Sequence, residues 1–225
     1  MATFQRARSE EQRAERRRAI LDTATAMLAE MPVAQLSLNE LSRRVGLAKS
    51  NVLRYFESRE AVLLELLDVA LQEWLEHLDG ALTAAVDADA APFERGDQVA
   101  ATLAASLAAR PVLCDLIGAQ AAVLERNVSP QVAAEYKHAI VANAHVLVRL
   151  VREHVRELGE HDAIRFAGAA TMATGAVWTH AQPSAAMLAA YEADPSLAAM
   201  RLDFTSTLRE IFEVLLTGLL ARPSR

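Results

Sequence analysis

The sequence contains few of the residues that cross-link, kink or interrupt a chain. Of its 225 residues, 8 are Gly, 7 are Pro and one, Cys114, is a cysteine. A single cysteine excludes an intrachain disulfide and is typical of a reducing compartment, so we expect a cytoplasmic protein. No apolar run follows the arginine-rich N-terminus, and the longest apolar stretch, near 167–178, is too short to span a bilayer. We therefore expect no membrane partner.

Aromatic residues are also scarce, at 5% of the chain, whereas hydrophobic residues make up 52%. Alanine and leucine are abundant in that hydrophobic fraction, and both favour helices. The composition predicts a globular all-α protein whose helices pack mainly through Ala, Leu and Val.

Charge is distributed unevenly along the chain, which carries a formal net charge of −6. Residues 1–60 contain 11 Lys and Arg against 8 Asp and Glu, while residues 61–225 contain the other 12 and 21. A basic N-terminal region on an acidic body suggests that this end meets a polyanion. The overall acidity argues against indiscriminate nucleic-acid binding.

Residues 36–60 have the pattern of a helix-turn-helix. Ser37 and Glu40 have the spacing of a capping box, which opens a short helix near 39–45. Gly46 stands where that helix would end, since glycine adopts the left-handed conformation at little steric cost. A second helix can begin at Ala48 or Lys49. In a helix-turn-helix, this second helix lies in the DNA major groove.

The rest of the chain shows helical spacing without the alternation of strands. The last helix has a clear apolar stripe, which could pack within the subunit, lie on a membrane or meet a twin subunit. Its polar face has few basic residues, so we favour the twin subunit over the membrane. The other expected helices lie near 13–30, 58–80, 95–109, 111–126, 130–158, 162–182 and 183–193, and the last near 195–221, with a polar arm over 1–12 and a loop over 87–92.

Residues 13–67 resemble the N-terminal part of the TetR family of bacterial transcriptional repressors. The resemblance is carried by a basic helix start, by ILDTATAMLAE and by LSLNELSRRVGLAKSNVLRYFESREAVL. It implies a homodimeric regulator that a small-molecule effector releases from double-stranded operator DNA. It also implies a DNA-binding domain at 1–58, with a flexible arm over 1–12, and a helical ligand-binding and dimerisation domain at 59–225. Whether the protein represses or activates depends on where its operator lies.

The resemblance assigns DNA contacts position by position. Asparagine can bond adenine bidentately, which makes Asn39 and Asn51 plausible base readers. The arginines of the first helix are expected to contact phosphates, which supply much of the affinity for DNA. The predicted DNA-binding residues are Arg16, Arg17, Ser37, Asn39, Lys49, Ser50, Asn51, Tyr55 and Arg59.

Three positions depart from the family pattern. Ala48 stands where Ser or Thr usually caps the recognition helix, and such a loss costs about 1 kcal/mol. Leu53 replaces a common tyrosine, which removes one hydroxyl that would bond a phosphate. Ser50 stands where glycine or proline is common. These changes affect the details of base contact rather than the expectation of DNA binding.

A ligand pocket and a dimer interface are likewise expected in the body of the protein. The family implies a four-helix interface built from the helices near 162–182 and 203–221 of two subunits. An apolar small molecule with few polar groups is the expected ligand. The predicted pocket residues are Leu107, Cys114, Ile117, Gln120, Tyr136, Asn143, Met172, Thr174 and Trp178.

No enzyme motif is present, and we expect neither a cofactor nor a metal. The sequence lacks a phosphate-binding glycine loop, GxSxG and HExxH. Glu135 and His138 have the ExxH spacing of di-iron bundles, but such sites need a second pair. The alternative hypothesis is a helical small-molecule-binding or enzymatic protein whose N-terminal helices are only structural. It would predict tight retention of a metal or cofactor.

Overall fold

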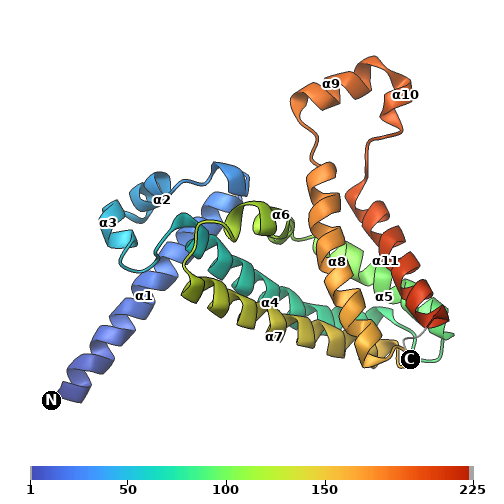
Figure 1. The fold of residues 1–225 in the computed structure, drawn as a ribbon, viewed down its shortest axis with the longest axis horizontal. Helices are drawn as coiled ribbons and strands as arrows, with labels where there is room; N and C mark the ends of the chain where they lie inside the picture. Colours follow the sequence, from blue (N-terminus) through green and yellow to red (C-terminus); the bar gives the residue numbers. More distant parts are fainter. Residues whose placement is uncertain (1, 223–225) are drawn as a thin grey trace. The chain divides into compact units, whose positions relative to one another are not determined.

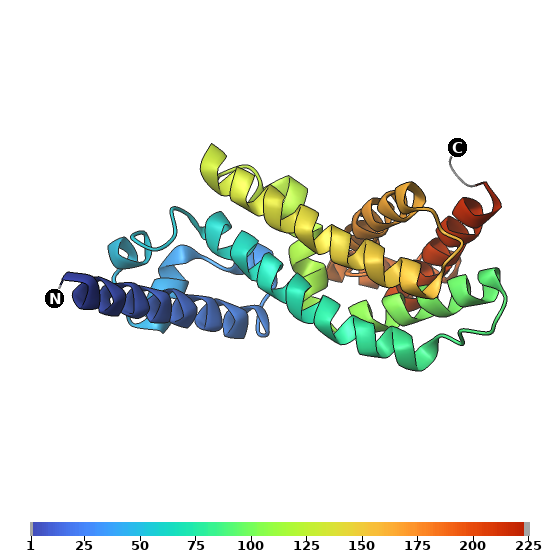
Figure 2. The ribbon, with the colours of Figure 1, turned by 90° about the horizontal axis from the view of Figure 1, so that it is seen from below.

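The computed structural model describes residues 2–222, and every regular element within them is a helix (Figures 1 and 2). The predicted all-α fold is confirmed. The elements are α1 (Ala2–Leu28), η1 (Val33–Gln35), α2 (Leu38–Val45), α3 (Lys49–Val52), α4 (Arg59–Ala85), α5 (Pro92–Ala108), α6 (Pro111–Ala119), the π-helical η2 (Gln120–Leu124), α7 (Pro130–His154), α8 (Glu160–His180), α9 (Ala185–Ala193), α10 (Pro195–Ala198) and α11 (Phe204–Ala221).

The chain folds into two compact units, which are described separately. Unit 1 consists of the residues up to Leu67 together with Ala119–Tyr136. Unit 2 consists of Asp68–Gly118 and the chain from Lys137 onward. Helices α4 and α7 contribute residues to both units. A boundary between residues 58 and 59 stays a prediction.

Helix α1 is longer than the sequence pattern indicated. We expected an arm over residues 1–12 and a helix from about Arg13, whereas α1 already begins at Ala2. Met1 lies outside the described residues. The added segment is rich in Ala, Arg, Glu and Gln and contains neither Pro nor Gly. These residues favour a helix even without an apolar stripe, which explains why periodicity alone did not reveal it.

The helix-turn-helix forms as its local sequence predicts. The Ser37 hydroxyl accepts a hydrogen bond from the Glu40 backbone N–H at 3.2 Å, which caps α2. Gly46 ends α2 with φ 73°, the left-handed conformation that favours glycine. Ala48 precedes α3 without a side-chain cap, as expected. The unit 1 core beneath these helices includes Ile20, Ala24, Met27, Leu41, Val52 and Phe56.

In unit 2, helix α11 packs against α5 and α8. Phe166 of α8 and Phe212 of α11 meet edge to face, with ring centroids 5.8 Å apart. Helices α6 and α8 approach closely at two glycines, because a Cβ on Gly175 would lie 3.3 Å from the Gly118 Cα. Glycine at both positions therefore allows the two helices to approach this closely.

Three expected helix boundaries are corrected. Helix α4 continues to Ala85 rather than ending near Gly80. The expected helix at 111–126 is α6 followed by the π-helical η2. The expected helix at 195–221 is two helices, because Asp203 accepts a hydrogen bond from the Ser206 N–H at 2.8 Å and starts α11 anew.

Helices α9 and α10 connect α8 to α11 and contain no buried residue. Within unit 2 they extend beyond the ends of α8 and α11 (Figure 1). Ser184 caps α9 and Asp194 caps α10 through backbone N–H groups, so local hydrogen bonds rather than a core define these two helices.

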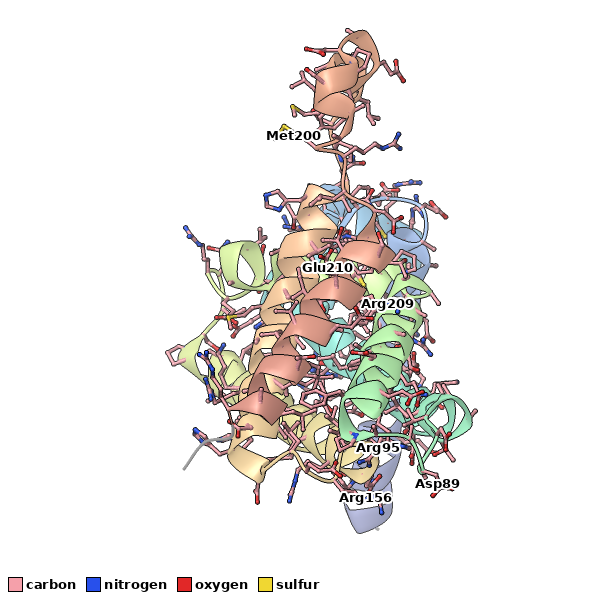
Figure 3. The ribbon with its side chains drawn as sticks, turned by 90° about the vertical axis from the view of Figure 1, so that its right-hand side faces the viewer. Asp89, Arg95, Arg156, Met200, Arg209 and Glu210 are labelled. Atoms are coloured by element: carbon pink, nitrogen blue, oxygen red, sulfur yellow. The ribbon has the colours of Figure 1, made fainter. Side chains whose placement is uncertain are left out.

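Arg95 of α5 joins three segments of unit 2. Its side chain is 3% exposed and donates to the carbonyls of Ala90 and His154, at 3.1 and 3.0 Å. It also forms hydrogen bonds of 2.6 and 2.7 Å to the Glu157 carboxylate. Arg156 donates to the Ala88 carbonyl at 3.0 Å, and Figure 3 shows both arginines beside the loop that carries Asp89. These bonds hold the loop before α5 against the end of α7.

We expect Arg95→Gln to lower the free energy of unfolding by about 2 kcal/mol, because hydrogen bonds to a charged group contribute about that much. Denaturant unfolding at pH 7 measures it. Arg209→Gln is the control, since the Arg209–Glu213 pair is exposed and should change the stability little.

The same cluster predicts acid sensitivity. The backbone N–H of Glu157 and the Arg95 guanidinium lower the pKa of the Glu157 carboxyl. A lowered folded-state pKa means that the stabilisation is present above the ordinary pKa near 4.5 and is lost as pH falls below it. Glu157→Gln should therefore flatten the stability profile below pH 4.5; an unchanged profile would contradict this role.

Candidate nucleic-acid interface

The candidate DNA-reading surface begins with α3. Lys49, Ser50 and Asn51 are exposed, whereas Val52 in the next position is fully buried. Phe56, after the turn that ends the helix, is buried as well. These two apolar anchors hold a four-residue helix on unit 1 and leave its polar residues free for another surface. The exposed Leu53 adds no polar group to it.

A polar depression adjoins the end of α3. It is formed by Arg13 and Arg16 of α1 and by Arg54 and Tyr55 of the turn after α3, with Gln12 and Glu15 at its edge. The three arginines are exposed, and Tyr55 is half-buried. Such a group of guanidinium and hydroxyl donors suits contact with phosphate oxygens. We call these four residues the basic cluster.

Arg54 is absent from the contacts predicted from sequence. The signal that could have found it is its place beside Tyr55, which was itself a candidate. Sequence alone did not show that the turn after α3 would bring Arg54 to the arginines of α1.

The structure separates the arginines of α1 that sequence reasoning grouped together. Arg17 donates from Nη1 to the Tyr55 carbonyl at 2.7 Å and from Nε to Glu65 at 2.9 Å. Its Nη2 also bonds Glu65, and its guanidinium carbon lies 4.2 Å from the centre of the Phe56 ring. The guanidinium of Arg17 is thus engaged within unit 1. Its contact with a phosphate stays a prediction.

Arg59 is placed in a similar way at the start of α4. Its guanidinium bonds the Val33 carbonyl and lies 3.4 Å from Glu60. Ser37 is exposed while it caps α2, and Asn39 is exposed in the first turn of that helix. The structure therefore leaves Ser37 and Asn39 accessible, and pairs both Nη atoms of Arg59 within its own unit, while its buried Nε has no hydrogen-bond partner among the described residues.

The two arginines at the end of α2 are largely neutralised. Glu40 accepts hydrogen bonds from Arg43, at 2.5 and 2.9 Å, and from Arg44 at 3.0 Å. These bonds hold the pKa of Glu40 at about 2, so its carboxylate stays charged at any physiological pH. Arg44 also bonds Glu30 at 2.7 Å. The positive charge of this surface therefore resides mainly in the basic cluster and Lys49.

Unit 2 contains a separate, small apolar cavity. Its volume of 20 Å³ holds little more than one water molecule. The polar groups on its wall are internally bonded: Thr174 donates to the Ala170 carbonyl and Trp74 to the Ser106 hydroxyl. The lining residues are Leu71, Trp74, Leu103, Leu107, Ile117, Leu147, Ala170, Thr171, Thr174 and Phe212.

Three of the predicted pocket residues, Leu107, Ile117 and Thr174, line this cavity. Met172 is 72% exposed on α8, and Asn143 bonds Asp68 at 2.7 Å.

The other four predicted residues have partners elsewhere. Gln120 bonds Glu125, and Trp178 packs on Phe204. Tyr136 is buried and belongs to unit 1. Cys114 is buried, which raises the pKa of its thiol to about 12 and keeps it unreactive.

Comparison with known proteins agrees with this architecture. The family description "Bacterial regulatory proteins, tetR family" matches residues 20–66. "Tetracyclin repressor-like, C-terminal domain" matches residues 68–223, which is more than half of the chain. The chain belongs to the TetR family. It is therefore a DNA-binding transcriptional regulator with an N-terminal helix-turn-helix.

Individual relatives of this TetR-family regulator are distant over most of its length. The regulator EthR of Mycobacterium tuberculosis is 43% identical over 54 residues, which are 24% of this chain and 25% of EthR. The match thus spans about a quarter of each protein.

Solved structures share the fold. A TetR regulator from Rhodococcus sp. RHA1 superposes with a TM-score of 0.58 at 11% identity, over 94% of this chain and 98% of that one. FadR from Bacillus subtilis, in complex with stearoyl-CoA, has a TM-score of 0.54 at 14% identity, over 89% and 97%.

The described residues of this TetR-family regulator were also compared with the requirements of a metal site and of a membrane-spanning helix. Among residues 2–222, no group of three or more His, Cys, Asp or Glu side chains is arranged to hold a metal ion. No single described helix is both long and apolar enough to cross a membrane. The pair α5 and α6 passes that test only jointly, with a bend of 92° between them.

If the basic cluster contacts phosphates, Arg54→Gln should weaken binding to every DNA sequence by a similar factor. It should also reduce the slope of log affinity against log salt by about 0.9, the value for one lost phosphate contact. Fluorescence anisotropy over a salt series measures both quantities. Arg149→Gln, on α7, is the matched control and should leave the slope unchanged. An unchanged slope in the Arg54 variant would exclude the contact.

Proposed function

We propose that this TetR-family regulator is a homodimeric repressor that binds operator DNA and is released from it by a small apolar ligand. The observation that carries the proposal is the exposed α3 surface, Lys49 to Asn51, with the basic cluster at its end. Base edges would be read by Asn51, Lys49 and Ser50, with Asn39 beside them. The arginines and Tyr55 would fix the register on the phosphate backbone.

The outer faces of α8 and α11 support dimerisation. Met172 and Val214 are 72% and 66% exposed, although both are apolar. Gly168, Ala176 and Gly218 are also exposed on these helices, and small residues let a partner helix approach closely. A symmetric pair would place the same surface of each subunit against the other. Two recognition helices could then occupy successive major grooves, roughly 34–36 Å apart.

The apolar cavity supports a ligand of low polarity. Its wall carries no side-chain charge, and the Thr174 hydroxyl and Trp74 N–H are already bonded within the protein. Because 20 Å³ is far too small for a metabolite, a ligand would have to enlarge the cavity. Leu71 and Trp74 of α4 lie on its wall. Enlarging the cavity would therefore act on α4, the helix that begins next to the DNA-reading residues.

Selection from random DNA, followed by gel shift with the upstream region of the chain's own gene, tests operator binding. We expect a specific, approximately palindromic site. Asn51→Ala should lose roughly 1–3 kcal/mol of discrimination at one base position in each half-site. Asn127→Ala, an exposed asparagine in the loop before α7, is the matched control. Failure to select any site would refute the proposed function.

The dimer is tested by sedimentation. Met172→Glu places a charge where the proposed interface excludes water, so the variant should be largely monomeric at concentrations where the wild type is a dimer. Since Met172 is exposed in the subunit, the helical circular dichroism should not change. Val141→Glu, at a comparably exposed apolar residue of α7, should stay dimeric. A dimeric Met172 variant would place the interface elsewhere.

A further inference from the structure

Arg17 contacts three other residues of unit 1, and none of these contacts would be needed if the side chain only bound a phosphate. Its guanidinium bonds Glu65 through Nε and Nη2, and bonds the Tyr55 carbonyl through Nη1 at 2.7 Å. The same group lies over the ring of Phe56. A guanidinium is planar and presents its donors as a rigid fork, so these contacts together define one position for it.

Each contact reaches a different part of unit 1. Arg17 belongs to α1, Glu65 belongs to α4, and Tyr55 and Phe56 follow the recognition helix α3. The Tyr55 N–H bonds the Val52 carbonyl at 2.9 Å, so the bond from Arg17 to the Tyr55 carbonyl lies immediately after the last turn of α3. Through this one side chain, α1 and α4 both determine where α3 ends.

The helix α3 depends on such external contacts because it is only four residues long. Isolated helices shorter than about 12 residues are not stable in water, and α3 has no side-chain cap at Ala48. Its position is set by the buried Val52 and Phe56 below it and by the hold on its C-terminal end. Loss of that hold would leave the polar residues of α3 exposed but less well oriented.

Electrostatics also distinguishes Arg17 from its neighbour Arg16. Glu65 neutralises most of the Arg17 charge, whereas Arg16 lies exposed in the basic cluster. These three bonds leave one N–H on each Nη of Arg17, so a phosphate contact would have to use donors that the pair with Glu65 already orients.

We infer that the Arg17–Glu65 pair is a positioning device: it fixes the end of the recognition helix and so controls DNA affinity without touching DNA. The inference rests on the proposed function, because it concerns the orientation of the surface that reads the operator. Glu65 lies on the same continuous helix as Leu71 and Trp74, which line the apolar cavity. A ligand that displaces α4 would therefore act on α3 through this pair.

Substitutions of Arg17 and Glu65 distinguish direct contact with DNA from positioning of α3, because the two roles predict opposite changes in affinity. If Arg17 contacts a phosphate, Arg17→Lys keeps the charge and should bind nearly as well as the wild type. If it positions α3, the lysine cannot reproduce the fork and affinity should fall. If Glu65 acts only through its negative charge, Glu65→Gln should strengthen DNA binding. If it positions Arg17, Glu65→Gln should weaken binding.

The experiment measures the dissociation constant of the full-length chain on its selected operator, over a salt series. Arg17→Lys and Glu65→Gln should each weaken binding roughly 5- to 20-fold, the effect of losing hydrogen bonds to a charged group. The salt slope should stay at the wild-type value in both. Arg149→Lys, which alters an exposed arginine–glutamate pair on α7, is the matched control and should bind as the wild type does.

Hydrogen exchange of the DNA-free protein provides the second readout. Amides of residues 51–56 should exchange faster in both pair variants than in the wild type and in Arg149→Lys. Wild-type affinity in Arg17→Lys, or tighter binding in Glu65→Gln, would overturn the inference. Unchanged exchange would overturn it as well. If the wild type selects no operator, the proposed function fails, while the exchange rates still decide whether the pair positions α3.

Discussion

The support that unit 1 gives to α3 is the constraint on which the candidate DNA-reading surface depends. Four residues cannot hold a helical conformation by themselves, so the surface that would read DNA is stable only where unit 1 supports it. Burial of Val52 and Phe56 supplies one support, and the bond from Arg17 to the Tyr55 carbonyl supplies another. If α3 reads DNA as proposed, its affinity can be changed at these supports as well as at its own exposed residues.

Local signals in the sequence were sufficient for the helix-turn-helix. The Ser37–Glu40 cap, the left-handed Gly46 and the missing cap at Ala48 each involve residues at most three positions apart, so the printed sequence contains the whole interaction. The restart of α11 at Asp203 has the same kind of signal, because Asp203 and Ser206 form a capping pair. The apolar spacing over 195–221 nevertheless predicted one continuous helix, because helical periodicity does not show where one helix ends and the next begins.

The roles of the arginines could not be predicted in this way. Arg16 and Arg17 are adjacent in sequence, but successive residues of a helix point about 100° apart. Arg16 belongs to the basic cluster, whereas Arg17 points toward Glu65, which is 48 positions away. A basic run predicts that a segment meets a polyanion; it does not predict which of its members are neutralised by the fold. Arg54 shows the converse, because the turn after α3 brings it to Arg13 and Arg16 of α1, which are distant from it in sequence.

The cavity illustrates a further limit of sequence reasoning. Asn143 and Thr174 are polar residues on apolar helices, where a polar group needs a partner, and both find one in the protein: Asn143 bonds Asp68, and Thr174 bonds a carbonyl one turn back on its own helix. Both are therefore satisfied without a ligand, and the cavity that remains is small and apolar. If a ligand of the proposed kind filled it by moving Leu71 and Trp74, its affinity and the displacement of α4 would draw on the same free energy. A ligand that fitted the cavity without moving Leu71 or Trp74 would bind without changing the hold on α3.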